Sequence, residues 1–309
     1  MFVWSKRNSG LEIILDRPRP GAWQQFFERP YHFLARLIYT WRRVKPAEPL
    51  VNPVSIVCIS DTHNSQPTLP DGDVLIHAGD LTQSGTFEEL QRAISWISAQ
   101  PHPFKVVIAG NHDFLLDVNW RGRSCSYNDD KACTRDMLEW GDIIYLENSE
   151  STITCASGRQ LRIYGSPYSA RHGSWAFQYP RSENVWEGTI SEKVDILVTH
   201  GPPRGHLDLL TLGCPHLLRE VWRVRPKLHV FGHIHEGAGT EWLSFDLLQN
   251  AYEQTIIANG GFKNLLWTIK AFLQSLHLPV REAKCLLVNP SMVGGLRDDD
   301  RRRPVKIIL

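Results

Sequence analysis

Five short apolar runs in this chain each end at a segment of Asp, Asn or His residues, and this repeated arrangement restricts the fold more than any other feature. The runs lie at 54–60, 74–78, 104–109, 195–199 and 228–231. Almost continuously apolar runs are typical of strands covered on both faces, as in α/β folds. The polar segments that follow them are Asp61-Thr62-His63, Gly79-Asp80, Gly110-Asn111-His112-Asp113, His200-Gly201 and Gly232-His233-Ile234-His235. Because sites in α/β sheets lie at the carboxyl ends of the strands, we expect these segments to converge.

The side chains in these segments favour a metal site. Asp, Asn and His suit Mn²⁺, Fe²⁺, Zn²⁺ or Mg²⁺, and the lack of Cys argues against a structural zinc cage. Asp61 and His63 are two residues apart, so both can reach one ion. Asp80 has two carboxylate oxygens and can bridge two ions, which in such sites lie roughly 3.5–4 Å apart and act together on phosphate esters. The sequence therefore predicts two divalent metal ions.

Composition excludes several other classes of protein. The 309 residues carry a formal net charge of only +1, which gives no long-range field for nucleic acid, so no nucleic-acid binding is predicted. No segment is typical of a secretory signal or of a transmembrane helix. The six cysteines form no CxxC pair, which favours reduced thiols and a cytoplasmic location. A disulfide between Cys125 and Cys133 stays open.

The ends of the chain differ from its centre. Residues 1–53 are predicted to form a helical extension and a Pro-rich linker, with a helix over 31–43, and residues 54–309 the main domain. The 31–43 helix either packs on the domain that follows or contacts a membrane surface or a partner protein. Residues 245–280 include a second helical segment that is a candidate insertion. Further expected elements are helices over 87–99, 134–140 and 265–276 and a hairpin that turns at 157–158.

The polar segments resemble those of the calcineurin-like metallophosphoesterases, whose pattern is D-x-H, G-D, G-N-H, a later lone His, and G-H-x-H. The wider context is similar to the branch called metallophosphoesterase-domain-containing proteins. The resemblance covers roughly 54–240. It implies a four-layer α/β/β/α sandwich in which helices flank two mixed sheets.

The resemblance also implies a role for each site residue. The first ion would be held by Asp61, His63 and His235. The second would be held by Asn111, His200 and His233, with Asp80 bridging the two. Mn²⁺ is the ion we favour, with Fe, Zn or Mg as alternatives.

Other residues are expected to act on the substrate. His112 would protonate the leaving oxygen, because the pKa of imidazole lies near working pH. Its neighbour Asp113 either orients that ring, as a carboxylate behind a histidine does, or points away. The expected substrate contacts are Asn111, His112 and His206.

The expected activity is hydrolysis of phosphate esters by a metal-bridging hydroxide, with phosphodiesters or cyclic nucleotides favoured. The expected partner is therefore a small phosphate ester or nucleotide, and the oligomeric state stays open. One alternative is a metal-dependent nucleotide-binding or scaffold protein with little turnover. A weaker alternative is a phosphoprotein phosphatase, because the G-D-x-x-D-R-G motif of that group is absent: Gly79-Asp80 is followed by Leu81-Thr82-Gln83-Ser84.

Overall fold

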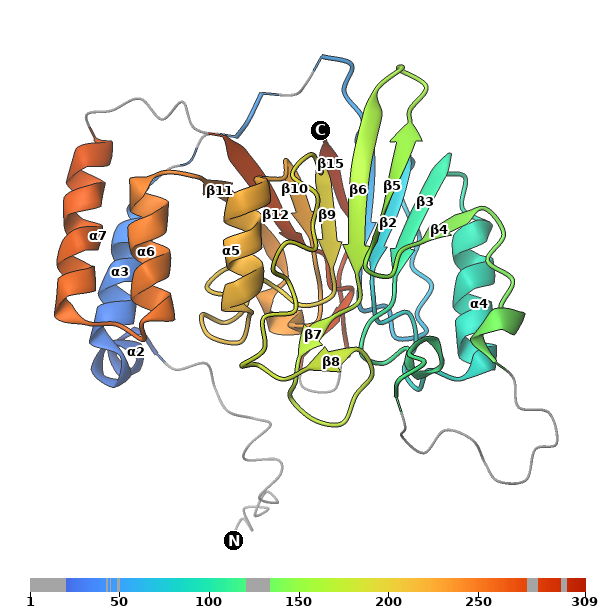
Figure 1. Ribbon diagram of the computed structural model, residues 1–309, viewed down its shortest axis with the longest axis horizontal. Helices are drawn as coiled ribbons and strands as arrows, with labels where there is room; N and C mark the ends of the chain where they lie inside the picture. Colours follow the sequence, from blue (N-terminus) through green and yellow to red (C-terminus); the bar gives the residue numbers. More distant parts are fainter. Residues whose placement is uncertain are drawn as a thin grey trace, which may run out of the picture.

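Two β-sheets packed face to face form the centre of the molecule (Figure 1). The computed structural model describes residues 21–42, 44, 46–48, 51–120, 134–276, 283–295 and 299–309. The first sheet has the strand order β15-β1-β2-β3-β4. Its strands are β1 (Ser55–Ile59), β2 (Val74–Ala78), β3 (Phe104–Ile108), β4 (Ile143–Tyr145) and β15 (Val305–Ile308). All pairs are parallel except β1 with β15, so the sheet is mixed.

The second sheet is also mixed and has the order β11-β12-β10-β9-β6-β5. Its strands are β5 (Ser149–Thr154), β6 (Gln160–Ser166), β9 (Ile196–Thr199), β10 (Leu228–Val230), β11 (Gly239–Ser244) and β12 (Lys284–Asn289). The two outer pairs are antiparallel and the three inner pairs are parallel. The β5–β6 hairpin turns where the sequence predicts it.

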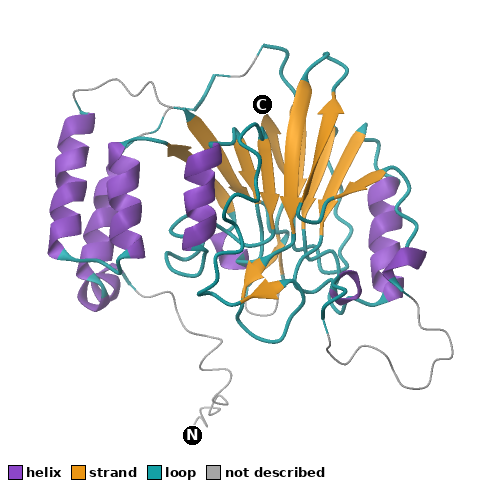
Figure 2. Cartoon of the chain, in the orientation of Figure 1, coloured by secondary structure: helices purple, strands orange, loops and turns teal. Residues whose placement is uncertain are grey.

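The alternation of side chains along the strands explains why the sheets pack together. Alternate residues of both sheets, among them Ile56, Ile76, Ile163 and Val198, form one buried core between them. The residues that point the other way are also apolar, and a helix covers each outer face. The result is the four-layer α/β/β/α sandwich, which confirms the expected fold (Figure 2).

Each covering helix buries one apolar stripe. In α4 (Phe87–Ser98), Leu90, Ile94 and Ile97 are buried against the first sheet, and Thr86 caps the first turn by accepting from the Glu89 N–H. In α5 (Pro215–Val224), Leu217 and Val221 belong to the core cluster on the second sheet.

The remaining elements are short. They are β7 (Ser169–Ala170), β8 (Gln178–Tyr179), β13 (Val293–Gly294), β14 (Asp300–Arg301) and 3₁₀ turns at Phe114–Leu116, Arg135–Met137 and His235–Gly237. The helix expected over 134–140 is thus a single turn.

A layer of helices lies beside the sandwich, next to β11 (Figure 1). Its members are α2 (Ala22–Glu28), α3 (Pro30–Trp41), α6 (Leu247–Ile257) and α7 (Phe262–Ser275). Ala35 of α3 is buried with Tyr252 of α6 and Leu265 of α7. Residues more than 200 positions apart in the sequence therefore share one small core, and α3 packs on the domain, as one of the two interpretations of this helix expects.

Buried and half-buried polar residues connect this layer to the second sheet. The Tyr39 hydroxyl of α3 lies 3.0 Å from Glu241 of β11 and 2.9 Å from Gln249 of α6. The two ring nitrogens of His206 lie 3.0 Å from Glu241 and 3.1 Å from Glu253. Because each of these buried groups has a partner, the cluster favours one orientation of the helices.

Two further features of the described residues are the state of their cysteines and the character of their helices. Cys58, Cys155, Cys214 and Cys285 are buried and unbonded to one another. Cys125 and Cys133 lie outside the described residues, so the question of a disulfide between them stays open. Among the described helices, none combines the length and apolar character that crossing a bilayer requires.

We expect the contribution of His206 to the free energy of unfolding to fall as the pH rises from about 6.5 to about 10. Burial alone would lower the pKa of His206, but Glu241 and Glu253 outweigh it and raise the pKa to about 10. An unfolded histidine has a pKa of about 6.5. When folding raises the pKa of a histidine, its full contribution to stability is present below the pKa of the unfolded state. This contribution is lost as the pH rises through the pKa of the folded state.

Urea unfolding of the wild type and of His206→Gln measures this effect. The difference in free energy between the two proteins should be smaller at about pH 10 than at about pH 6. A difference that does not change with pH would contradict the assignment of a charged His206.

Candidate metal centre

The predicted ligands do converge, at the carboxyl ends of strands from both sheets. Asp61 follows β1, Asp80 follows β2 and Asn111 follows β3, while His200 and His233 follow the neighbouring strands β9 and β10. Because β1, β2 and β3 run parallel in adjacent register, their ends meet at one edge. The ends of the second sheet face that edge across the sandwich, so the site lies on the seam between the sheets.

The backbone at the ligands adopts a rare conformation. Four of them have positive φ angles: 50° at Asp61, 41° at His63, 54° at Asp80 and 69° at His233. Residues with a side chain adopt this region at an energetic cost, and such residues are concentrated at functional sites. The local chain is therefore bent sharply where it presents each side chain.

Glycines in the same segments allow very close approach. A Cβ at Gly110 would lie 2.3 Å from the backbone nitrogen and from the Oδ1 atom of Asp80. A Cβ at Gly232 would lie 2.2 Å from the Asp61 carboxylate. Glycine thus precedes Asp80, Asn111 and His233 because a side chain at these positions would clash with neighbouring atoms.

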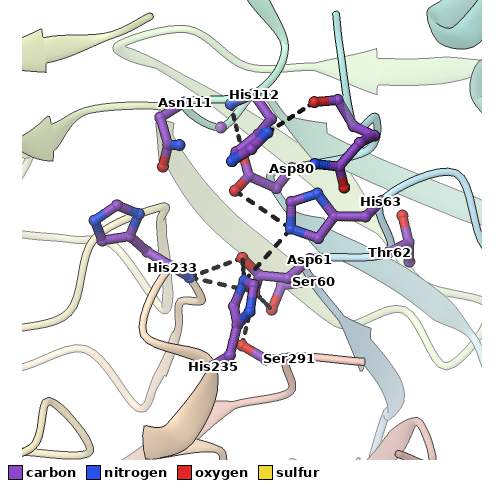
Figure 3. Close-up of polar contacts among 12 residues, drawn as sticks. Ser60, Asp61, Thr62, His63, Asp80, Asn111, His112, His233, His235 and Ser291 are labelled. Atoms are coloured by element: carbon purple, nitrogen blue, oxygen red, sulfur yellow. Dashed lines mark hydrogen bonds and ion pairs between the residues drawn. The ribbon is translucent and has the colours of Figure 1, made fainter. Parts of the chain in front are cut away.

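One group of donors is formed by Asp61, His63, Asp80 and His235, whose ligand atoms all lie within 4.8 Å of one another. The Nε2 atoms of His63 and His235 are 3.4 Å apart (Figure 3). His235 Nε2 is 3.3 Å from Asp61 Oδ1, and His63 Nε2 is 3.9 Å from Asp80 Oδ2. Two imidazoles and two carboxylates facing one point are a suitable set for a divalent ion.

The second group consists of Asp80, His200 and His233, whose ligand atoms also lie within 4.8 Å of one another. His200 Nε2 is 3.4 Å from Asp80 Oδ2 and 2.9 Å from the amide oxygen of Asn111. Asp80 is therefore common to both groups, which is the arrangement a bridging ligand requires.

The charges of these groups fit a cation. Burial would raise the pKa of Asp61 and of Asp80, but the hydrogen bond from His235 and the charge of His200, respectively, hold both pKa values below the ordinary range. Burial lowers the pKa of His63 and of His233, which keeps these rings in the neutral form that binds metal. Although burial opposes it, Asp80 raises the pKa of His200 to about 9, and an ion would replace that proton.

Two serines that the sequence analysis missed hold Asp61 in place. Ser60 Oγ and Ser291 Oγ donate to Asp61 Oδ2 at 2.6 and 2.7 Å, and the His233 N–H donates to Asp61 Oδ1 at 3.0 Å (Figure 3). Ser291 follows β12, so it too lies just beyond the carboxyl end of a strand. The apolar run that forms β12 was the signal that could have indicated it.

Asp113 supports the loops, and the hydrogen bonds of its carboxylate go to the backbone and side chain of neighbouring loop residues, not to the His112 ring. Its carboxylate accepts from the backbone N–H groups of Gly110, Leu81 and Thr82 at 2.8, 3.2 and 3.0 Å. It therefore ties the loop that carries Asn111 to the loop that carries Asp80. Of the two expectations for Asp113, the one in which it points away from His112 fits the geometry.

His112 lies beside the first donor group. Its ring centroid is 4.7 Å from that of His63, and its Nδ1 lies 2.8 Å from the Gln83 carbonyl oxygen. Its backbone N–H donates to Asp80 Oδ1 at 2.7 Å. The Gln83 carbonyl thus fixes the ring, which is the orienting function considered for Asp113 as one of two alternatives.

Aromatic side chains extend from His112 along the rim of the site. The partly exposed Trp175 ring lies 4.5 Å from the His112 ring, and Phe114 stacks on Trp175 at 5.7 Å. His172, in the same loop as Trp175, lies 4.7 Å from the His233 ring. This loop therefore borders both donor groups.

His206 is not brought to this site. Its ring is fully buried, and its two nitrogens bind the carboxylates of Glu241 in β11 and Glu253 in α6. The expected substrate contact by His206 does not agree with this placement. Its position only six residues after His200 suggested proximity, but the chain leaves the site in between.

Gly110→Ala is expected to weaken Mn²⁺ binding about 10- to 100-fold, the usual size of effects from residues that position metal ligands. The new Cβ would clash with the backbone nitrogen and the Oδ1 atom of Asp80, both 2.3 Å away, so Asp80 would have to shift. Gly201→Ala is the matched control, because the nearest atom to its Cβ would be 3.4 Å away. Isothermal titration with Mn²⁺ compares the variants, and equal affinities would contradict the geometry described here.

Comparison with known proteins agrees with this geometry. The calcineurin-like phosphoesterase family matches residues 54–237, which include every ligand described above. The chain is 40% identical over 205 residues to metallophosphoesterase domain-containing protein 1 of Homo sapiens, over 59% of this chain and 61% of that protein. The Mus musculus protein of the same name matches to the same extent.

A longer relative matches almost the whole chain. The chain is 42% identical over 307 residues to a protein of Emericella nidulans named probable rhamnogalacturonate lyase C, over 96% of this chain but only 28% of that protein. The chain thus spans between about a quarter and three fifths of the length of these relatives. From the match over 54–237 and the two donor groups that share Asp80, we conclude that the chain belongs to the calcineurin-like phosphoesterase family.

Proposed function

We propose that this protein is a metal-dependent phosphoric ester hydrolase that prefers phosphodiesters, cyclic nucleotides among them. The observation that carries the proposal is the position of Asp80, which belongs to both donor groups while its Oδ1 atom accepts from the His112 N–H. The ligand sites and the candidate acid are thus joined at one carboxylate.

The chain's own residues would divide the work as follows. Asp61, His63 and His235 would hold one ion, and Asn111, His200 and His233 the other, with Asp80 shared. Ions bound there would polarise a phosphoryl oxygen and provide a nucleophile at neutral pH. We favour Mn²⁺, with Fe, Zn or Mg as alternatives, because the donors mix imidazole with carboxylate and amide oxygen.

His112 would protonate the leaving oxygen. With Nδ1–H donated to the Gln83 carbonyl, Nε2 is the ring atom left for the substrate. The substrate would therefore receive its proton from Nε2. A proton placed by such a residue usually contributes about 10²–10⁴-fold to the rate.

The aromatic rim supports a nucleotide as substrate. Trp175 presents apolar surface next to His112, and the stack of Phe114 on Trp120, with ring centroids 4.3 Å apart, supports it from behind. A base that stacks on an aromatic side chain gains about 1–3 kcal/mol. The buried free thiols support our further expectation of a reducing, cytoplasmic location.

The alternatives explain fewer of these features. A nucleotide-binding or scaffold protein with little turnover needs no proton donor beside the ligands, yet His112 is held there. The lyase name belongs to a protein of which this chain matches 28%, and that match spans the phosphoesterase segment. We therefore do not extend the lyase activity to this chain.

We expect His112→Ala to lower kcat about 100-fold or more for a cyclic nucleotide, whose leaving oxygen is an alkoxide. The loss should be much smaller for a p-nitrophenyl phosphodiester, because that leaving group needs no proton. Metal content should stay that of the wild type. Stopped assays with Mn²⁺ and elemental analysis of the same samples make the comparison, and an equal loss for both substrates would refute the role as acid.

We expect Trp175→Ala to raise KM for a cyclic nucleotide about tenfold, with little change in kcat, because only base stacking is lost. Trp175→Phe should restore most of the affinity. The cyclic ribose phosphate that lacks the base is the control substrate and should be unaffected. If KM rises equally for both substrates, Trp175 positions the loop and does not bind the base.

A further inference from the structure

The outermost helix, α7, carries an apolar stripe on the side that faces solvent. In Figure 1 this helix forms the edge of the molecule, with α3 and α6 between it and the sandwich. Besides Trp267, which is 38% exposed, five large apolar side chains in and just after this helix are 37–63% exposed. They are Phe262, Leu266, Ile269, Leu273 and Leu276, and we refer to them as the outer stripe.

The spacing of the outer stripe follows the helical period. Its members succeed one another at intervals of four, three, four and three residues, which places all of them on one face. A different face, with Leu265, Thr268 and Ala271, is buried against α3 and α6. Among the described residues, α3 and α6 therefore bury one apolar face of α7, while the outer stripe is exposed to solvent.

The neighbouring helix α3 enlarges this surface. The Trp41 ring lies 6.4 Å from the ring of Phe272, and Trp41 and Leu37 are 64% and 37% exposed. We call the outer stripe together with Leu37 and Trp41 the outer apolar face. Contiguous exposed apolar surface of this kind marks an interaction site.

The charge around the outer apolar face is exclusively positive on these two helices. Lys263 and Lys270 are exposed on α7, and Arg36 is exposed on α3. Neither α3 nor α7 contains Asp or Glu. Apolar and Trp side chains beside lysine and arginine are typical of helices that lie in the interface of an anionic bilayer.

We propose that the outer apolar face docks this protein onto anionic lipid bilayers, with α7 lying in the headgroup region. The sequence left open such a contact for residues 31–43, and in the structure most apolar residues of α3 pack against α6 and α7. Positive charge on both copies disfavours self-association through the same face, whereas anionic lipid complements it. The proposal does not depend on the enzymatic activity proposed above.

Co-sedimentation of the full chain with vesicles tests the proposal. We expect binding to vesicles of phosphatidylcholine with phosphatidylserine, and much weaker binding to phosphatidylcholine alone or at high salt. Leu266→Glu/Leu273→Glu should lower the partition coefficient at least about tenfold, because two leucines no longer enter the bilayer. Both positions are exposed, so thermal unfolding should be close to that of the wild type.

A charge-matched variant separates insertion from electrostatics. Gln254→Glu/Gln274→Glu adds the same two charges at exposed positions outside the outer stripe and should keep most of the binding. Equal loss in both variants would overturn the insertion of the stripe. Absence of vesicle binding by the wild type would overturn the proposal, as would dimerisation in light scattering that only the leucine variant abolishes.

Discussion

The shared position of Asp80 is the constraint on which the rest of the site depends. This carboxylate lies within ligand distance of histidines from both sheets, and it does so from a residue with a positive φ angle. Gly110 leaves room for it, and Asp113 ties together the two loops that flank it. The polar network thus places one oxygen pair between two sets of ligands before any ion binds, which reduces the cost of assembling the site.

The sandwich explains why ligands from distant parts of the chain meet. Parallel strands in each sheet end at the same edge, and the buried core between the sheets brings the two edges together. Asp61 and His235 are separated by most of the domain, yet their side chains are 3.3 Å apart. The geometry of the site therefore depends on how the two sheets pack against each other.

Much of this arrangement could be predicted from sequence, because the signals were local. Buried strands are recognisable in the sequence as apolar runs, and each segment that carries ligands follows one of these runs. What could not be predicted depended on tertiary contacts. Ser291 reaches Asp61 across the sandwich, and His206 leaves the site because Glu241 and Glu253 bind both of its nitrogens. The pairing of α3 with α6 and α7 joins residues far apart in the chain, and no local pattern indicates it.

The most direct test of the account is electron paramagnetic resonance during titration of the metal-free protein with Mn²⁺. A site bridged by Asp80 should bind two ions per chain and give the spectrum of an exchange-coupled pair, and Asp80→Asn should lose that coupling. Binding of a single ion per chain, with the spectrum of an isolated Mn²⁺, would contradict the claim that the chain builds a two-metal centre.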